Sequence, residues 1–283
     1  MRDLATIPDA PPADLRFRRG ISVVRSLREV WASRDLVATL VEREFRVRYK
    51  QAALGAAWAL AQPVALVLAF TLFKRGSHIE TGHVAYAVWA FLGLLPWSLF
   101  SAGLSQGGVS LLNNVALINK VYCPREVFPV SMVGVACGDT LVAVLGLAGL
   151  MVVTGTVPQW TSFYLVPLFA VQLVFTLAAT LAISAIVVHV RDIRHVLPVV
   201  LPVGLFINPI AIPLDRLVPA HERLVYSIFN PLGPVIDDYR RVVLFGQAPD
   251  WHLLIPAAIS SVVLFLLATH LFRRLEVGFA DLV

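Results

Sequence analysis

The chain has 283 residues, of which 58% are hydrophobic and only 14% are charged, with a formal net charge of +5. A typical soluble domain is about 45–50% apolar and about 25% charged, so this composition excludes an ordinary soluble protein. The mean hydropathy of +0.78 arises from long uncharged runs, and a helix that crosses a membrane needs about 20 such residues. The sequence therefore predicts an all-α protein with several membrane spans.

Residues 1–50 are expected to form a cytoplasmic tail that contains an amphipathic helix. On a helical wheel, one half carries apolar side chains and the other half carries polar ones. The apolar half holds Ile21, Val23, Val24, Leu27, Val30 and Trp31, and the polar half holds Ser22, Arg25, Ser26 and Glu29. We expect this helix to lie on the inner membrane surface, where arginines meet anionic lipid headgroups, although a soluble helix packed on a partner has the same pattern.

Six membrane-spanning helices are predicted within a transmembrane domain of residues 51–272, because isolated backbone in lipid must bond to itself. Their approximate bounds are 51–73, 84–104, 128–153, 163–188, 196–214 and 253–272, and residues 273–283 form a second cytoplasmic tail. With both termini cytoplasmic, 17 of the 23 Lys and Arg residues fall on the inner side. The positive-inside rule favours this orientation.

Asp139 is the only carboxylate expected at mid-membrane depth, which makes it a candidate functional residue. One interpretation is a hydrogen bond to another helix, which the small residues Gly134 and Gly138 would allow to approach closely. The alternative is a proton relay in a proton-coupled transporter, for which no span offers an obvious second titratable group.

The 196–214 segment contains Pro198, Pro202, Pro209 and Pro213, which project within about 60° of one face of an ideal helix. Each proline removes a backbone hydrogen bond and frees a carbonyl one turn earlier, and that carbonyl needs a polar partner. Asn208 adds a polar side chain. We therefore expect this helix to line a hydrated conduit, although purely structural kinks give the same pattern.

The long outer connection, residues 215–252, predicts more than a loop. Leu224–Phe229 is apolar but too short to span a membrane, turn signals follow at Asn230-Pro231 and Gly233-Pro234, and a helix can restart over Val235–Phe245. This pattern predicts a re-entrant helical hairpin that dips into the outer leaflet. A helical pair that rests on the membrane surface is the alternative.

Asp237 and Asp238 precede Arg240 and Arg241 at spacings that form i,i+3 and i,i+4 ion pairs on a helix. The same two carboxylates are the outer candidates for a competing hypothesis, a membrane-embedded glycosyl or lipid transferase. That hypothesis needs a metal or acid-base constellation, and ion pairing is the commoner reason for this spacing.

The short inner connection from His189 to His195 is interpreted as a docking or headgroup-contacting loop, because a metal site would need further ligands. No phosphate loop of the type G-x-x-x-x-G-K-[ST], no H-E-x-x-H and no G-x-S-x-G occurs in the sequence. We therefore expect no catalytic residues, no metal and no cofactor in this chain. Without a phosphate loop, the chain is not expected to hydrolyse ATP itself.

Several short segments form a series between about residue 35 and residue 240. They are Glu44–Lys50, Leu54–Trp58, Gln62-Pro63, Gly93–Trp97, Asn119–Glu126, Arg191–Arg194, Asn208–Ile210 and Asn230–Leu232. Each alone is weak, but their combination resembles the permeases of ABC-2 type polysaccharide exporters, which handle O-antigen, capsule, galactan and teichoic acid. In the turn after Asn230, Gly233 stands where that family commonly has Thr.

The resemblance implies a homodimeric permease in the bacterial cytoplasmic membrane that exports a lipid-linked glycan. Its protein partners would be two copies of a cytoplasmic P-loop ATPase, and ATP and Mg would bind to that ATPase. The permease would also contact membrane lipids, and no nucleic acid is expected as a partner. The segment Ser110–Glu126 would contain the coupling helix and the 191–195 loop a second contact. The residues implied in ATPase coupling are Asn113, Asn114, Asn119, Lys120, Tyr122, Pro124, Arg125, Glu126, Arg191, Asp192 and Arg194.

The resemblance also implies that the amphipathic tail helix is an inner gate and the hairpin an outer gate. The outer-gate residues would be Phe229, Asn230, Pro231 and Pro234. Aromatic side chains offer flat apolar area to sugar C–H surfaces, and the prolines expose carbonyls. The resulting channel-lining candidates are Trp58, Phe70, Phe73, Trp89, Trp97, Pro198, Pro202, Asn208 and Pro209. Interfacial anchoring explains Trp97 and Phe73 equally well.

Overall fold

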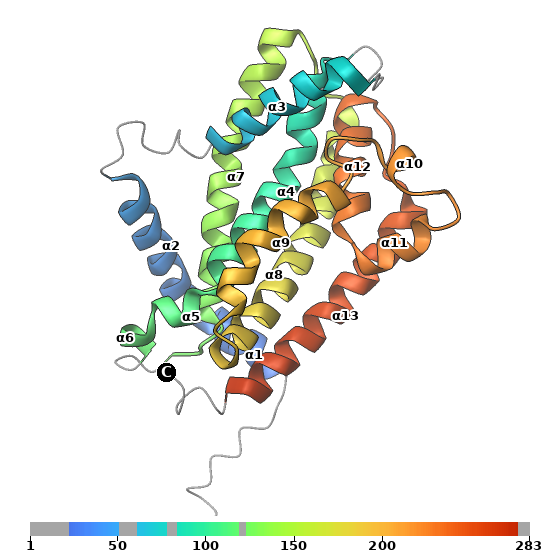
Figure 1. Ribbon diagram of the computed structural model, residues 1–283. Helices are drawn as coiled ribbons and strands as arrows, with labels where there is room; N and C mark the ends of the chain where they lie inside the picture. Colours follow the sequence, from blue (N-terminus) through green and yellow to red (C-terminus); the bar gives the residue numbers. More distant parts are fainter. Residues whose placement is uncertain (1–22, 51–60, 78–83, 119–122, 277–283) are drawn as a thin grey trace, which may run out of the picture.

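The computed structural model describes residues 23–50, 61–77, 84–118 and 123–276, and every regular element within them is helical (Figure 1). In chain order these are α1 (Val23–Ala32), α2 (Arg34–Tyr49), α3 (Ala61–Ser77), α4 (Tyr86–Gly108), α5 (Ser110–Asn113), α6 (Val115–Ile118), α7 (Val127–Thr154), the 3-10 helix η2 (Trp160–Tyr164), α8 (Leu165–His189), α9 (Ile193–Ile207), α10 (Leu214–Leu217), α11 (Arg223–Phe229), α12 (Leu232–Leu244) and α13 (Trp251–Glu276). The predicted all-α fold is confirmed.

Four helical segments of the described chain are long and apolar enough to cross a membrane: 86–108, 127–154, 160–189 and 251–276. They match the predicted second, third, fourth and sixth spans. Helix α4 is the central one, since it packs against α7, α8, α12 and α3, and α8 in turn packs against α13. The core between them is built from large side chains of α4 such as Phe91 and Leu94, each at most 3% exposed.

The predicted fifth span ends earlier than expected. Helix α9 stops at Ile207, whereas the prediction extended to residue 214, and the backbone of Asn208 is already extended. Fifteen residues make a helix of about 22 Å, which is short of a hydrocarbon core of about 30 Å. The first ten residues of the predicted 51–73 span lie outside the described chain, and α3 covers the rest. The count of six spans therefore stays a prediction.

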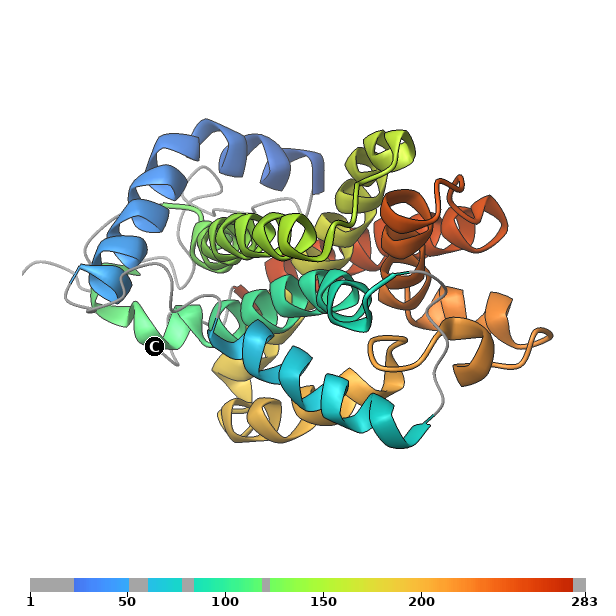
Figure 2. The same cartoon turned by 90° about the horizontal axis from the view of Figure 1, so that it is seen from above.

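The predicted amphipathic helix is present as α1, and it continues after a one-residue break into α2. Helix α2 leans along α7, at the opposite side of the molecule from α10 and α11 (Figures 1 and 2). The two small residues of α7 explain this approach, because a Cβ atom added to Gly134 would crowd Val41, and one added to Gly138 would overlap the ring of Phe45. The close helix contact predicted at these glycines is confirmed, and its partner is α2.

The predicted helix-turn-helix in the outer connection is also present. Helices α11 and α12 are joined by Asn230 and Pro231, and they pack on α13 and α4 respectively. We refer to residues 223–244 as the hairpin. Helices α1, α5 and α6 and the last turns of α13 lie at one end of the molecule, and α10 to α12 lie toward the other (Figure 1). Whether the hairpin enters a membrane leaflet stays a prediction.

Candidate functional site

An ion cluster joins three elements at the α1 end. Arg273 of α13 contacts Glu126, which precedes α7, at 2.6 Å between Nε and Oε1, and Glu29 of α1 at 2.6 Å between Nη2 and Oε2. Arg273 Nη1 also lies 3.2 Å from Oε2 of Glu276. The hydroxyl of Ser26 on α1 donates to Glu126 Oε1 at 2.7 Å. The coupling segment, the amphipathic helix and the last long helix therefore meet at Arg273.

Burial sets the electrostatics of this ion cluster. Glu126 is only 1% exposed, and burial raises the pKa of its carboxyl, against the effects of Ser26 and Arg273. Burial also acts to raise the pKa of Glu29, but hydrogen bonds from Arg273 and Arg25 outweigh it, so that this pKa is lowered. Glu126 was assigned to ATPase coupling by resemblance, and its side chain faces the protein interior.

Those other coupling residues that the structure describes lie at the same end of the molecule as the ion cluster. Asn113 is exposed at the end of α5, and Asn114 accepts a hydrogen bond from Arg43 of α2 at 2.9 Å. Pro124 and Arg125 are half-buried, and Arg191, Asp192 and Arg194 are exposed between α8 and α9. Asn119, Lys120 and Tyr122 lie outside the described residues. The two predicted contact segments thus form parts of one surface, since α5 packs against α8.

Both carboxylate oxygens of Asp139 accept hydrogen bonds. Arg48 donates to Oδ2 at 2.7 Å and the hydroxyl of Tyr49 donates to Oδ1 at 2.7 Å, and both residues belong to α2. Arg48 also donates to Gln106 of α4. These hydrogen bonds join α7 to α2, as the first interpretation of Asp139 expects, and the role of Asp139 in transport stays a prediction. Arg48 and Tyr49 lie in one of the segments that carry the family resemblance, and no local pattern indicates that they pair with a residue about ninety positions later.

The broken backbone after α9 is satisfied by a residue of the hairpin. Arg240 is only 1% exposed, and its guanidinium donates to the carbonyls of Pro209 and Ile210 at 2.5 and 2.7 Å and to the carbonyl of Trp89 at 3.0 Å. The guanidinium carbon also lies 3.3 Å from the ring centroid of Trp89. For Pro209 and Ile210, the polar partner that the broken backbone needs is therefore the guanidinium of Arg240.

The two Asn-Pro segments noted in the sequence meet in space. Asn230 Nδ2 donates to Asn208 Oδ1 at 3.0 Å and to the hydroxyl of Tyr226 at 2.9 Å, and that hydroxyl donates to the carbonyl of Ile207 at 2.9 Å. A Cβ atom on Gly233 would overlap the ring of Tyr226, so glycine at this position lets the ring lie against the turn. The outer-gate segment is thereby tied to the end of α9.

The remaining gate and channel candidates differ in exposure. Phe229 is 82% exposed, whereas Pro231 and Pro234 are buried. Trp89 and Trp97 are 3% and 4% exposed, and Trp97 packs beside Gly204 of α9. Pro198 and Pro202 are exposed on α9, whereas Pro209 is buried. Trp58 and the side chains of Phe70 and Phe73 lie outside what the structure describes. The roles of these residues as gate and channel lining stay predictions.

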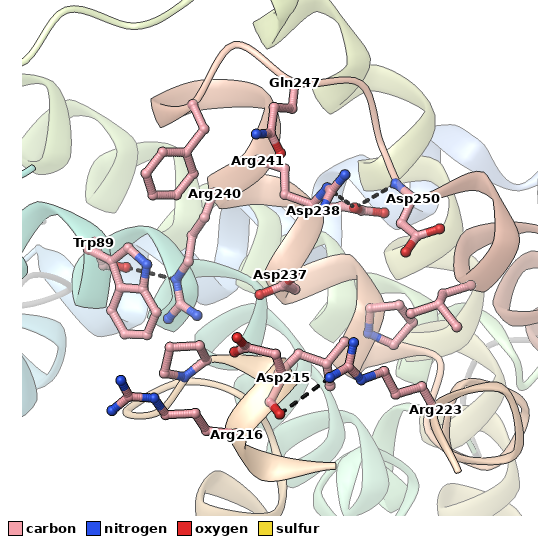
Figure 3. Close-up of a pocket in the computed structure, with 15 residues that line it drawn as sticks. Trp89, Asp215, Arg216, Arg223, Asp237, Asp238, Arg240, Arg241, Gln247 and Asp250 are labelled. Atoms are coloured by element: carbon pink, nitrogen blue, oxygen red, sulfur yellow. Dashed lines mark hydrogen bonds and ion pairs between the residues drawn. The ribbon is translucent and has the colours of Figure 1, made fainter. Parts of the chain in front are cut away.

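A polar cavity of about 530 Å³ lies beside the hairpin (Figure 3). Asp238 of α12 forms part of its wall, with Oδ1 3.6 Å from Arg241 Nε and accepting the N–H of Asp250 at 2.8 Å. The i,i+3 ion pair predicted for this stretch is confirmed. Burial raises the pKa of Asp238 to about 7, opposed chiefly by the Asp250 hydrogen bond. Among the described residues, no group of three or more His, Cys, Asp or Glu side chains is placed to hold a metal ion.

Comparison with known proteins identifies the family. The family model described as ABC-2 type transporter matches residues 35–244. The O-antigen export system permease protein RfbA of Myxococcus xanthus is 30% identical over 92% of this chain and 99% of its own length. RfbA of Klebsiella pneumoniae is 24% identical, over 88% of this chain and 95% of its own, and the polysialic acid transport protein KpsM of Escherichia coli is 25% identical, over 85% and 93%. The chain therefore belongs to the ABC-2 type transporter family.

Proposed function

We propose that this chain is the transmembrane permease subunit of an ATP-driven exporter of a lipid-linked polysaccharide, of the O-antigen, galactan or teichoic-acid type. The observation that carries the proposal is the match to a permease named for O-antigen export, which covers 92% of this chain and 99% of that permease. The glycan would cross the bacterial cytoplasmic membrane, with both termini of the chain on the cytoplasmic side.

The proposal includes a separate ATPase, because the sequence has no phosphate loop of its own. Two chains of this permease would assemble with two ATPase subunits. The exposed end of α5 and the exposed loop at Arg191 to Arg194 share one end of the molecule, as a common docking surface requires. The Arg273 cluster lies at the same end and connects that surface to α1 and α13.

Two other activities have less support. A proton-coupled transporter needs a carboxylate that is free to exchange protons, and both oxygens of Asp139 accept hydrogen bonds from α2. A transferase built on Asp237 and Asp238 needs a free acidic pair, and Asp238 is bonded to Asp250 and paired with Arg241.

The experiment is co-purification of the tagged chain from its native membrane in mild detergent, with mass spectrometry and an ATP hydrolysis assay. We expect a P-loop ATPase to co-purify in a stoichiometric amount. Lys120→Ala combined with Arg191→Ala should reduce the amount of co-purified ATPase at least tenfold. Arg274→Ala is the control, because Arg274 is an exposed arginine near the same end but outside both contact segments. In cells, the double variant should accumulate lipid-linked glycan on the cytoplasmic side. A chain that exports glycan without any ATPase would contradict the proposal.

A further inference from the structure

The cavity beside the hairpin is closed on several sides by elements that are distant in sequence. Its wall comes from α12, from the segment around Pro213 to Arg216, from the connection between α12 and α13, and from Trp89 of α4 (Figure 3). Its volume of about 530 Å³ falls within the range of about 300–1,000 Å³ that small-molecule sites occupy. Pro234, one of the outer-gate residues, is part of the wall.

The charges that line this cavity balance. Four carboxylates, those of Asp215, Asp237, Asp238 and Asp250, face four guanidinium groups, those of Arg216, Arg223, Arg240 and Arg241. When all eight groups are ionised their formal charges sum to zero, and the lining then favours neither an anion nor a cation. Two of the four arginines already have partners, since Arg240 donates to three backbone carbonyls and Arg223 donates to the carbonyls of Val218 and Asp215.

The wall also contains an unused acceptor and an unused donor. Asp238 Oδ2 and Arg241 Nε are buried and have no hydrogen-bond partner, although each residue is close to the other. A hydroxyl group can donate one hydrogen bond and accept two, so it can satisfy both kinds of group at once. Both residues line the cavity, and the Arg241 side chain is 36% exposed. A hydroxyl also bonds to Asp238 in either protonation state.

One part of the lining is apolar and accessible. Phe245 follows α12 and is 44% exposed at the cavity. Aromatic rings present a flat apolar surface, which suits the C–H face of a pyranose, while carboxylate, guanidinium and amide groups suit its hydroxyls. Gln247, also exposed, supplies an amide with both donor and acceptor.

We propose that this cavity binds a neutral sugar residue of the exported glycan, with Asp238 and Arg241 bonding to its hydroxyls and Phe245 covering one face. The inference rests on the proposed function and adds a substrate contact within a single chain, beside the gate.

The test uses the intact permease with its ATPase in lipid nanodiscs. The probe is the polysaccharide of the same organism, released from its lipid by mild acid, and binding is followed by saturation-transfer NMR. We expect saturable binding that is weakened about tenfold by Asp238→Ala, in line with the loss of a hydrogen bond to a charged group. Phe245→Ala, which changes an exposed side chain and so preserves the fold, should weaken it several-fold.

Two matched controls separate this cavity from general effects. Glu222→Ala removes an exposed carboxylate near α11, and Phe163→Ala removes an exposed aromatic side chain of η2, and neither residue lines the cavity. Both should leave binding unchanged. Inorganic phosphate at equal concentration should not compete.

Equal binding by wild type, Asp238→Ala and Phe245→Ala would overturn the proposal, as would competition by phosphate. Absence of glycan binding, in a preparation that contains the ATPase and exports glycan, would overturn the sugar site alone. Absence of both the ATPase and export would instead contradict the proposed function.

Discussion

Arg48 of α2 and Asp139 of α7 form an ion pair that is largely buried. Their side chains are 26% and 19% exposed, and the nitrogen and oxygen atoms lie 2.7 Å apart. Removing one partner leaves the other charged and poorly hydrated, whereas removing both leaves no unpaired charge. The energetic cost of the two changes should therefore be strongly non-additive.

We expect a double-mutant cycle of Arg48→Met and Asp139→Asn to give a coupling free energy of roughly 0.5–3 kcal/mol in thermal or denaturant unfolding. The control pair is Arg46 and Glu42, an exposed i,i+4 pair on the same helix, for which the expected coupling is at most about 0.5 kcal/mol. Asp139→Asn combined with Arg48→Met should retain export. Loss of export in that stable double variant would restore a protonation role for Asp139.

At the scale of elements, the contact between α2 and α7 depends on the absence of a side chain at Gly138. Gly138→Ala places a methyl group against the ring of Phe45, and overpacking of this kind costs about 1–3 kcal/mol. Gly149 lies on the same helix with nothing within 4 Å of an added Cβ, so Gly149→Ala should stabilise by up to about 1 kcal/mol through helix propensity. In thermal unfolding, we therefore expect Gly138→Ala to lower the Tm and Gly149→Ala to raise it. Phe45→Leu should reduce the destabilisation caused by Gly138→Ala. Equal effects of the two alanines would mean that α2 does not pack on α7.

The same elements show what sequence could and could not predict. Helices α4, α7, α8 and α13 and the wheel of α1 were predictable because hydropathy and periodicity are local properties. The end of α9 was not, because the carbonyls of Pro209 and Ile210 bond to Arg240, about thirty residues later in the chain. Likewise, nothing near Glu126 in the sequence shows that Ser26 and Arg273 enclose it.

At the scale of the whole molecule, Arg273 of α13 contacts both Glu29 of α1 and Glu126, which precedes α7. Its side chain is 10% exposed and that of Glu126 is 2% exposed, so Arg273→Met leaves Glu126 buried without its cation. Losing one member of a buried pair costs about 3–5 kcal/mol. We expect a fall of several degrees in Tm and faster trypsin cleavage after Arg25 and Arg28, because α1 loses its bond to α13.

The loss of Tm caused by Arg273→Met should depend on pH. Burial already raises the pKa of Glu126, and loss of Arg273 raises it further, so at low pH the carboxyl takes up a proton and no unpaired charge remains. The Tm deficit of Arg273→Met should therefore be smaller at pH 5 than at pH 8, and Glu126→Gln in the same chain should remove that difference. Arg274→Met, which changes the exposed neighbouring arginine, should show neither effect. If instead both arginine variants behaved alike, α1 would be held by the membrane and not by this cluster, and a signal from the coupling segment would have to reach α1 by another route.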